Sequence, residues 1–313
     1  MQKATKGILR KSRFGAENLR TGIILCILLL IPLYGEKMSD GITRGMRLCA
    51  ETIIPSVFPF MILSSMMIGY SVFDHFEFLS RPFEKLFRIN RSGLPAFLCG
   101  TLCGFPLGAK CAAEAYERGL LSKDECERLI GFSSNASPAF LICGVGAMRK
   151  SATEGVFLYA IMMIAAIATG MLIGRKKAPS TRINVQRAPS FSFTDAVERA
   201  GIGTLYVCSY LLLFSAIIGI LQAFVLKNNI VSALLLPFLE IGSATSFLAR
   251  TDISPILSLP LTAFSVSFGG LSVHLQAAGL LRGTGISMKR YYLCKLFQGG
   301  LALGITFFLF PFI

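Results

Sequence analysis

Long apolar runs constrain this chain of 313 residues more than any other feature. A helix that crosses about 30 Å of hydrocarbon needs about 20 apolar residues. Five continuous runs approach that length, at 21–34, 52–73, 153–174, 204–225 and 296–312. Hydrophobic residues make up 53% of the chain and charged residues 15%, so a soluble globule would expose too much apolar surface. The sequence predicts an all-α integral membrane protein with several spans.

Basic residues lie in short clusters beside these runs. The chain has 31 Lys and Arg against 17 Asp and Glu, and the clusters fall at 1–20 and at 175–187. Loops retained in the cytoplasm carry this excess, so it indicates topology and not nucleic-acid binding. The first apolar run also resembles a signal peptide, but no convincing pair of small residues marks a cleavage site. We expect a basic cytoplasmic segment at 1–20, an uncleaved first helix at 21–35 and a basic cytoplasmic linker at 175–192.

The residue types that would support metal binding or catalysis are sparse. Nine cysteines lie mostly inside apolar runs, without a paired CxxC motif, and the chain has only two histidines. A structural zinc site needs a tighter cluster of ligands. No set of acid, base and nucleophile is evident. We therefore expect no metal, no cofactor and no enzyme activity.

Two pairs of segments recur in the same order. The sequence TDAVERAG at 194–201 follows the pattern of SDGITRGM at 39–46, and both read as amphipathic helices at a membrane interface, over 39–51 and 194–203. Farther along, Leu94-Pro95 matches Leu259-Pro260 and Gly104 matches Gly269, a displacement of 165 residues. The sequence predicts a duplication, with repeat 1 at 36–174 and repeat 2 at 193–313.

The number of crossings gives the two repeats opposite orientations. With both basic loops inside, the segment near 93–118 must enter and leave on the cytoplasmic face, as a re-entrant hairpin. Its counterpart near 257–283 then opens from the outer face. We expect a polytopic helical bundle with an inverted repeat, two re-entrant hairpins and broken transmembrane helices. Secondary transporters with this layout bind their substrate near the bilayer midplane.

Helix breaks supply the candidate site residues, because hydrocarbon cannot satisfy free backbone groups and a break therefore indicates a cavity. Half-helix N-termini also favour anionic groups. The alternatives are close packing by the glycines, back-bonding by the serines, a lysine that reaches the cytoplasmic face, a histidine that only packs, and an interfacial glutamate. The candidates for substrate binding are Gly104, Pro106, Gly108, Lys110, Ser134, Asn135, Ser137, Pro138, Glu240, Gly269, Gly270, Ser272, His274 and Gln276.

Four motifs in fixed order resemble a known family. GFPLGAK, ERGLLSKDECERL, SNASPAFLICGVG and FGGLSVHLQ are similar to the sporulation integral membrane protein family YlbJ, over roughly residues 36–311. The resemblance implies a likeness to the gate region of concentrative nucleoside transporters. It also implies export of dicarboxylic dipicolinic acid across the outer forespore membrane during endospore formation. By motif, Gly104, Pro106, Gly108, Asn135, Ser137, Pro138, Gly269, Gly270, Ser272 and Gln276 would line the pathway.

The residues and the resemblance together predict a membrane transporter or facilitator for a small anionic solute. Dipicolinic acid is the first candidate, because half-helix N-termini and a nearby Lys110 suit an aromatic dicarboxylate. Two alternatives are a nucleoside-type transporter and a non-transporting scaffold that recruits sporulation partners through its basic loops. The lipid bilayer is the expected partner, and the sequence leaves the coupling ion and the oligomeric state open.

Overall fold

A computed structural model describes residues 21–22, 25, 32–70, 77–175, 192–227 and 229–310. These residues form helices joined by short turns, without a strand among them. The prediction of an all-α protein is thus confirmed for the described part of the chain. The basic segment at 1–20, most of the first apolar run and nearly all of the linker at 175–192 lie outside the described residues.

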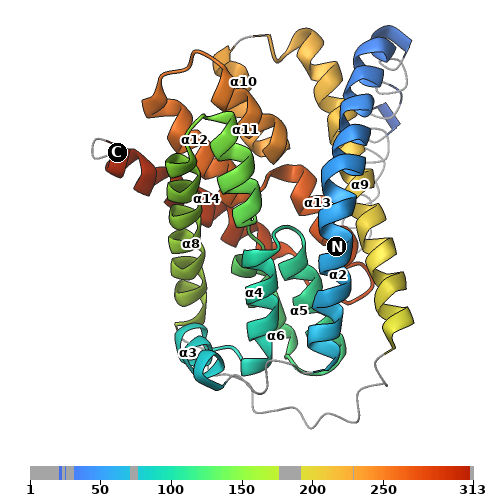
Figure 1. The fold of residues 1–313 in the computed structure, drawn as a ribbon, viewed down its shortest axis with the longest axis vertical. Helices are drawn as coiled ribbons and strands as arrows, with labels where there is room; N and C mark the ends of the chain where they lie inside the picture. The colour runs from blue at the N-terminus through green and yellow to red at the C-terminus, as the bar shows by residue number, and fades with distance from the viewer. Residues whose placement is uncertain are drawn as a thin grey trace, which may run out of the picture.

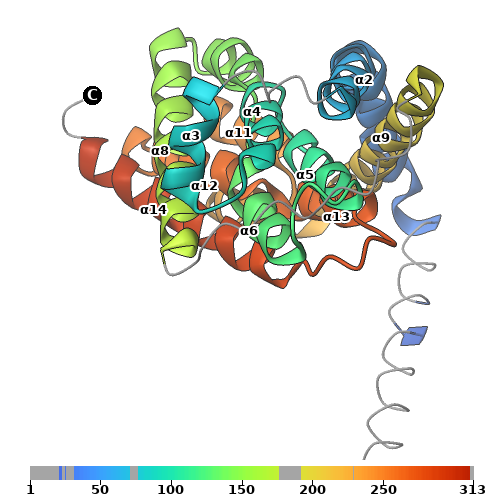
Figure 2. The ribbon, with the colours of Figure 1, turned by 90° about the horizontal axis from the view of Figure 1, so that it is seen from below.

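Two long helices stand side by side along one edge of the molecule (Figures 1 and 2). The first runs helically over 32–48 and continues through the π-helix η1 (Cys49–Ile53) into α2 (Ile54–Gly69). The second is α9 (Phe193–Phe224). They are antiparallel, since the rings of Tyr34 and Phe224 are 5.6 Å apart at one end and Thr204 contacts Met61 towards the other.

The prediction of separate interfacial helices at 39–51 and 194–203 is wrong, because each segment continues into the next span as one helix. Small residues explain the difference. A Cβ added at Gly41 would lie 2.3 Å from the carbonyl oxygen of Ser215, and one at Gly219 would lie 2.4 Å from that of Lys37. A Cβ added at Gly203 would likewise lie 2.7 Å from the sulfur of Met61, so each segment packs against the other long helix.

Short helices of the first half follow the long helix. They begin with α3 (Glu77–Phe87), η3 (Arg91–Gly93), α4 (Leu94–Leu102) and α5 (Leu107–Glu117), of which α4 and α5 pack together as a hairpin. Next come α6 (Lys123–Ser133), η4 (Ala139–Val145), α7 (Gly146–Met148) and α8 (Ala152–Gly174). Helix α6 begins in a capping box formed by Ser122 and Glu125, as the motif SKDE favours.

The second half contains α10 (Asn229–Leu239), α11 (Ile241–Arg250), α12 (Pro255–Phe268), α13 (Gly270–Leu280) and α14 (Lys289–Leu309). Helix α12 packs along α14, whereas α13 packs against α9. The predicted second hairpin thus takes another form. Helices α12 and α13 diverge from a sharp bend at Gly269 instead of packing along each other as α4 and α5 do (Figure 1).

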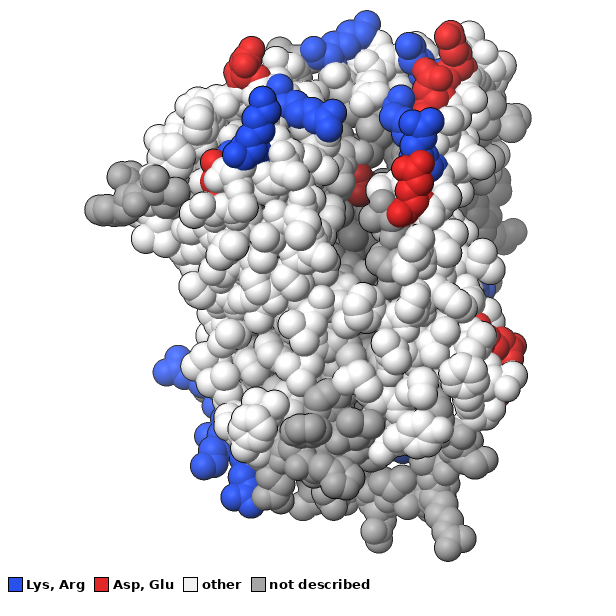
Figure 3. All heavy atoms as spheres, viewed as in Figure 1, with Lys and Arg blue, Asp and Glu red and all other residues white. Residues whose placement is uncertain are grey.

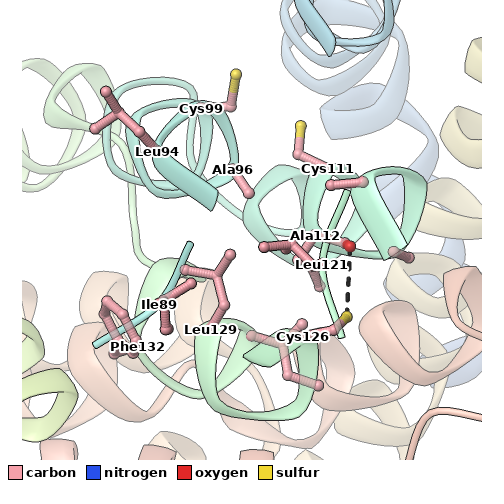
Figure 4. Close-up of a cluster of buried hydrophobic side chains, with 14 of the residues drawn as sticks. Ile89, Leu94, Ala96, Cys99, Cys111, Ala112, Leu121, Cys126, Leu129 and Phe132 are labelled. Carbon is pink, nitrogen blue, oxygen red and sulfur yellow. Dashed lines mark hydrogen bonds between the residues drawn. The ribbon is translucent and has the colours of Figure 1, made fainter. Parts of the chain in front are cut away.

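A buried apolar cluster packs against the hairpin of α4 and α5. It joins α4, α5 and α6 and includes Ile89, Leu129 and Phe132, and the thiol of Cys126 donates a hydrogen bond to the carbonyl oxygen of Ala112 (Figure 4). A second cluster joins the two halves, because Leu141 and Leu158 pack with Leu259. The hairpin and the break after α6 are therefore held on a close-packed base.

Four helical stretches of the described chain are long and apolar enough to cross a bilayer, and they are Ala152–Gly174, Phe193–Phe224, Pro255–Leu280 and Lys289–Leu309. The third of them comprises α12 and α13 with the bend at Gly269 between them. Many large apolar side chains on them point outward, such as Leu205, Leu293 and Phe308. On the face in Figure 3, charged side chains gather towards the two ends, and a broad zone between them is mostly uncharged. This pattern is that of a helical membrane protein.

Candidate substrate site where the helix breaks meet

The turn between α4 and α5 approaches the end of α6 so closely that only glycine fits. A Cβ at Gly100 would lie 1.8 Å from the carbonyl oxygen of Ser133, and one at Gly108 would lie 2.4 Å from the same oxygen. At the turn itself, Gly104 has φ +92°, and a Cβ there would lie 3.0 Å from the backbone nitrogen of Ser137. The predicted tip of the first hairpin therefore lies against the predicted break.

The break after α6 spans the motif SNASP. Helix α6 ends at Ser133, and η4 begins at Ala139 with Pro138 as its N-cap. The backbone amide of Phe140 donates to Ser137 Oγ at 3.2 Å, so that hydroxyl satisfies one free amide of the new helix. The side chains of Ser134 and Asn135 are buried in the interrupted stretch.

The bend between α12 and α13 meets the first turn. Gly269 and Gly270 have φ of +94° and +77°, in the region that side chains with a Cβ rarely adopt. A Cβ at Gly269 would lie 3.1 Å from the ring of Phe105, and one at Gly270 would lie 3.1 Å from the backbone of Leu239 and Glu240. The interruptions of the two halves therefore lie next to each other.

A lysine outside the predicted site residues lies at this meeting point. Lys295 of α14 is fully buried, and its ammonium lies 5.1 Å from the centre of the Phe105 ring. It donates to the carbonyl oxygen of Ser134 at 2.6 Å and to Gln298 Oε1 at 2.9 Å. Within the described chain Lys295 makes no ion pair with a carboxylate, so its partners carry no negative charge.

An amide network completes the surroundings of Lys295. Gln298 donates to Asn135 Oδ1 at 2.8 Å, and Asn135 donates to the carbonyl oxygen of Phe132 at 2.8 Å. The contact between Lys295 and Asn135 Oδ1 is the longest of the lysine's three, at 3.4 Å. An anion could replace this weak contact at small cost.

Four buried hydroxyls at the ends of α6 and α12 have no hydrogen-bond partner among the described residues. They are Ser133 and Ser134 on one side and Ser265 and Ser267 on the other. Leaving a buried hydroxyl unpaired costs about 1–3 kcal/mol. A polar ligand that reached these groups would recover part of that cost.

Other predicted site residues have hydrogen-bond partners other than Lys295. The side chain of Glu240 is buried and caps α11, since it accepts from the amides of Gly242 at 2.7 Å and Ser243 at 2.6 Å. Gln276 donates to Ser272 at 3.3 Å within α13. Both side chains therefore lie inside the protein, and neither of these hydrogen bonds involves Lys295.

His274 lies in a cage of aromatic rings. Its ring centre is 4.5 Å from that of Phe268, and its Nδ1 lies 3.2 Å from the hydroxyl of Tyr291. Its Nε2 is buried without a partner in the described chain. Lys110 faces towards α2, where it donates to the carbonyl oxygen of Met61 at 3.2 Å, and it pairs with Glu114 of its own helix at 2.9 Å. It is buried and does not extend to the surface.

A cavity of about 410 Å³ lies between the pair of long helices and α10–α11. Its walls include Arg44, Gln222 and Arg250, and its lining reaches Glu240 and Ser243 at the start of α11. Figure 3 shows a hollow between these two parts of the molecule, with charged side chains around its upper end. Because Gly270 packs on the backbone of Glu240, the inner wall of this cavity adjoins the bend at Gly269.

No metal site emerges from the described side chains, which contain no group of three or more His, Cys, Asp or Glu residues able to hold an ion. The chemistry available at the meeting point is therefore that of a cation, two amides and several hydroxyls. Such a set can bind and release a polar or anionic solute.

One feature of the sequence marks Lys295 as a candidate site residue. It lies a single residue before the apolar run at 296–312, and an ionisable side chain inside a membrane helix is a functional candidate by default. Gln298, inside the same run, is a second polar exception. The boundary placed at 296 excluded the lysine from the span, whereas α14 begins at Lys289.

The fold and the site define a helical integral membrane protein with an internal polar centre. No protein family model matches the chain, and no solved structure matches it. The chain is 26% identical over 298 aligned residues to the sporulation integral membrane protein YlbJ of Bacillus subtilis (strain 168), covering 82% of this chain and 73% of the relative. This match supports the resemblance to the YlbJ family of sporulation integral membrane proteins that the four motifs indicated.

Proposed function

We propose that this protein is a transporter or facilitator that moves a small anionic solute through the site at Lys295. The observation that carries the proposal is a fully buried ammonium surrounded by neutral oxygens. A buried charge without an opposite partner is costly in a low-dielectric interior. An anionic solute would supply that partner during each transport cycle.

An aromatic dicarboxylate of the dipicolinic acid class is the substrate we propose. One carboxylate of the substrate would form an ion pair with the ammonium of Lys295. The unpaired hydroxyls of Ser134 and Ser267 would donate hydrogen bonds to other oxygens of the substrate. The ring of Phe105, which borders the lysine, offers an apolar face for an aromatic ring. The resemblance to a sporulation integral membrane protein supports the same substrate. We propose that the transport step takes place in the outer forespore membrane.

The arrangement of the interrupted helices supports an alternating-access cycle. The two long helices are antiparallel, and the interruptions of the two halves meet, which suits an inverted repeat built around a central site. In this proposal the 410 Å³ cavity is the access route from one face. The hairpin α4–α5 closes the other face.

Efflux from proteoliposomes tests the proposal. Vesicles loaded with dipicolinate are compared with and without the protein, and parallel vesicles are loaded with uridine to test the nucleoside alternative. We expect faster efflux of dipicolinate alone. Equal dipicolinate rates with and without protein would reject the anion transporter, and uridine efflux alone would favour the nucleoside alternative.

A further inference from the structure

A second buried polar cluster lies between α5 and α2 and is not used by the proposed substrate site. Lys110 and Glu114, one helical turn apart on α5, are only 6% and 8% exposed. Lys110 Nζ lies 2.9 Å from Glu114 Oε1. Ionisable pairs at membrane depth are costly to bury and are kept mainly where they function.

Helix α2 supplies the neutral partners of this pair. Lys110 donates to Ser65 Oγ at 2.5 Å and to the carbonyl oxygen of Met61 at 3.2 Å. The hydroxyl of Ser65 lies within donor reach of Glu114 Oε1, at 2.9 Å, and of the Met61 carbonyl, at 3.1 Å, but it has one proton to donate. The carboxylate of Glu114 takes part in these contacts through Oε1 alone.

The second oxygen, Glu114 Oε2, is buried and has no hydrogen-bond partner among the described residues. Each carboxylate oxygen has room for about two donors, so this is the most poorly satisfied charged atom in the cluster. A proton on Oε2 would remove the unpaired charge while Oε1 continued to accept its present bonds. The site is thus built to take a proton.

Few other charged groups face the pair. Helix α2 adds the hydroxyl of Ser64, and α4 and α5 add thiols. The other charged or titratable side chains on the elements around α5 have partners elsewhere or are exposed. His274 of α13 contacts Tyr291, Arg91 of η3 pairs with Glu84, and Arg199 of α9 pairs with Glu117. On α6, Asp124 pairs with Arg128 and Arg290, Glu125 with Ser122 and Glu127 with Ser287, and Lys123 is exposed. The nearby thiols are Cys99, Cys103 and Cys111. Glu114 is therefore the acid whose charge is balanced by Lys110 alone.

We propose that Glu114 is a proton-binding site that couples transport of the anionic solute to proton movement. A proton from water adds to Oε2, no covalent bond breaks, and the ion pair becomes Lys110 beside a neutral acid. The hairpin then carries one uncompensated positive charge, which favours an anion inside the protein. Release of the proton restores the neutral pair and favours release of the anion, so one proton accompanies each solute molecule in the same direction.

The inference rests on the proposed function, and wild-type protein distinguishes the two. Proteoliposomes that contain a trapped pH-sensitive dye receive external dipicolinate, and dipicolinate uptake and internal pH are recorded together, with protein-free vesicles as the control. We expect uptake accompanied by internal acidification. Uptake without a proton signal would overturn the coupling and leave the transporter standing, whereas the absence of uptake would overturn both.

A matched pair of variants tests the residue. Glu114→Gln should exchange internal for external dipicolinate at equal pH, but should lose the acceleration produced by an acidic outside solution. In wild-type protein, a gradient of about one pH unit should support up to about tenfold accumulation if one proton moves with each solute. Glu117→Gln is the matched control, because Glu117 lies three residues after Glu114 on α5 and forms an exposed pair with Arg199. This variant should keep the full response to the pH gradient. A Glu114→Gln protein that still accumulates dipicolinate along with wild type would contradict the inference.

Discussion

The ammonium of Lys295 lies 2.6 Å from the carbonyl oxygen of Ser134, so a helix of the second half of the chain is bonded to the break in the first half. The carbonyl is free to accept because Ser134 is no longer helical. The break and the lysine thus depend on each other. Their contact is the structural basis of the anion site that we propose.

Removal of the Lys295 charge should abolish most anion transport while preserving the fold. A hydrogen bond to a charged group contributes about 1.5–3 kcal/mol, so Lys295→Met should weaken dipicolinate binding by about tenfold to about 150-fold. The substitution also leaves the carbonyl oxygen of Ser134 and Gln298 Oε1 without their donor, so we expect a moderate fall in the melting temperature of a protein that still folds. Lys289→Met, at the exposed start of the same helix, is the control. Normal dipicolinate affinity in Lys295→Met would contradict the assignment of the site.

The amide network should behave as one unit. Asn135→Ala removes the acceptor of Gln298 and the donor to Phe132, and each buried group left unpaired costs about 1–3 kcal/mol. We expect a clear fall in the melting temperature of the purified protein in detergent. In a double-mutant cycle with Gln298→Ala, the combined loss should be smaller than the sum of the two. Additive losses would mean that the two amides act independently.

Glycine at position 100 should be required for the hairpin to approach α6. Gly100→Ala would place a methyl group 1.8 Å from the carbonyl oxygen of Ser133, so the hairpin must move away from the break. We expect loss of transport at normal expression. Gly304→Ala in α14, where nothing lies within 4 Å of an added Cβ, is the control and should be neutral or slightly stabilising. A scaffold without transport would tolerate both changes in assays of sporulation.

Arg44 and Arg250, which line the cavity, should strengthen the initial binding of the solute. Neither Arg44 nor Arg250 pairs with a carboxylate in the described chain, and both line the route towards Glu240. Exposed charges contribute about 0.2–1 kcal/mol, so Arg44→Gln and Arg250→Gln should each raise the KM for dipicolinate by up to about fivefold. Salt should diminish the difference from wild type. Arg47→Gln, whose side chain lies beside Glu51 outside the cavity, should leave KM unchanged.

The sequence predicted the interruptions because their signals are local. Glycine at 104 and 269 permits a positive φ, and SNASP ends one helix and caps the next. The angle after each interruption depends on tertiary packing, which is why the bend at Gly269 is not the hairpin expected from its likeness to Gly104.

Two other features depend on contacts that no local pattern specifies. An apolar stripe that faces a bilayer surface looks the same in sequence as one that faces a neighbouring helix, so 39–51 was assigned to the interface although Gly41 packs on Ser215. A lysine at the start of an apolar run can extend to the surface or be buried. Lys295 is buried because α14 packs against α12, α6 and α8.

A structure with bound dipicolinate, determined by electron cryo-microscopy in lipid nanodiscs, tests the central claim most directly. Our account predicts density for a carboxylate within hydrogen-bonding distance of Lys295 Nζ, in place of its long contact with Asn135, and loss of that density in Lys295→Met. Bound dipicolinate away from Lys295, with the lysine still held by Ser134, Asn135 and Gln298 alone, would contradict the account.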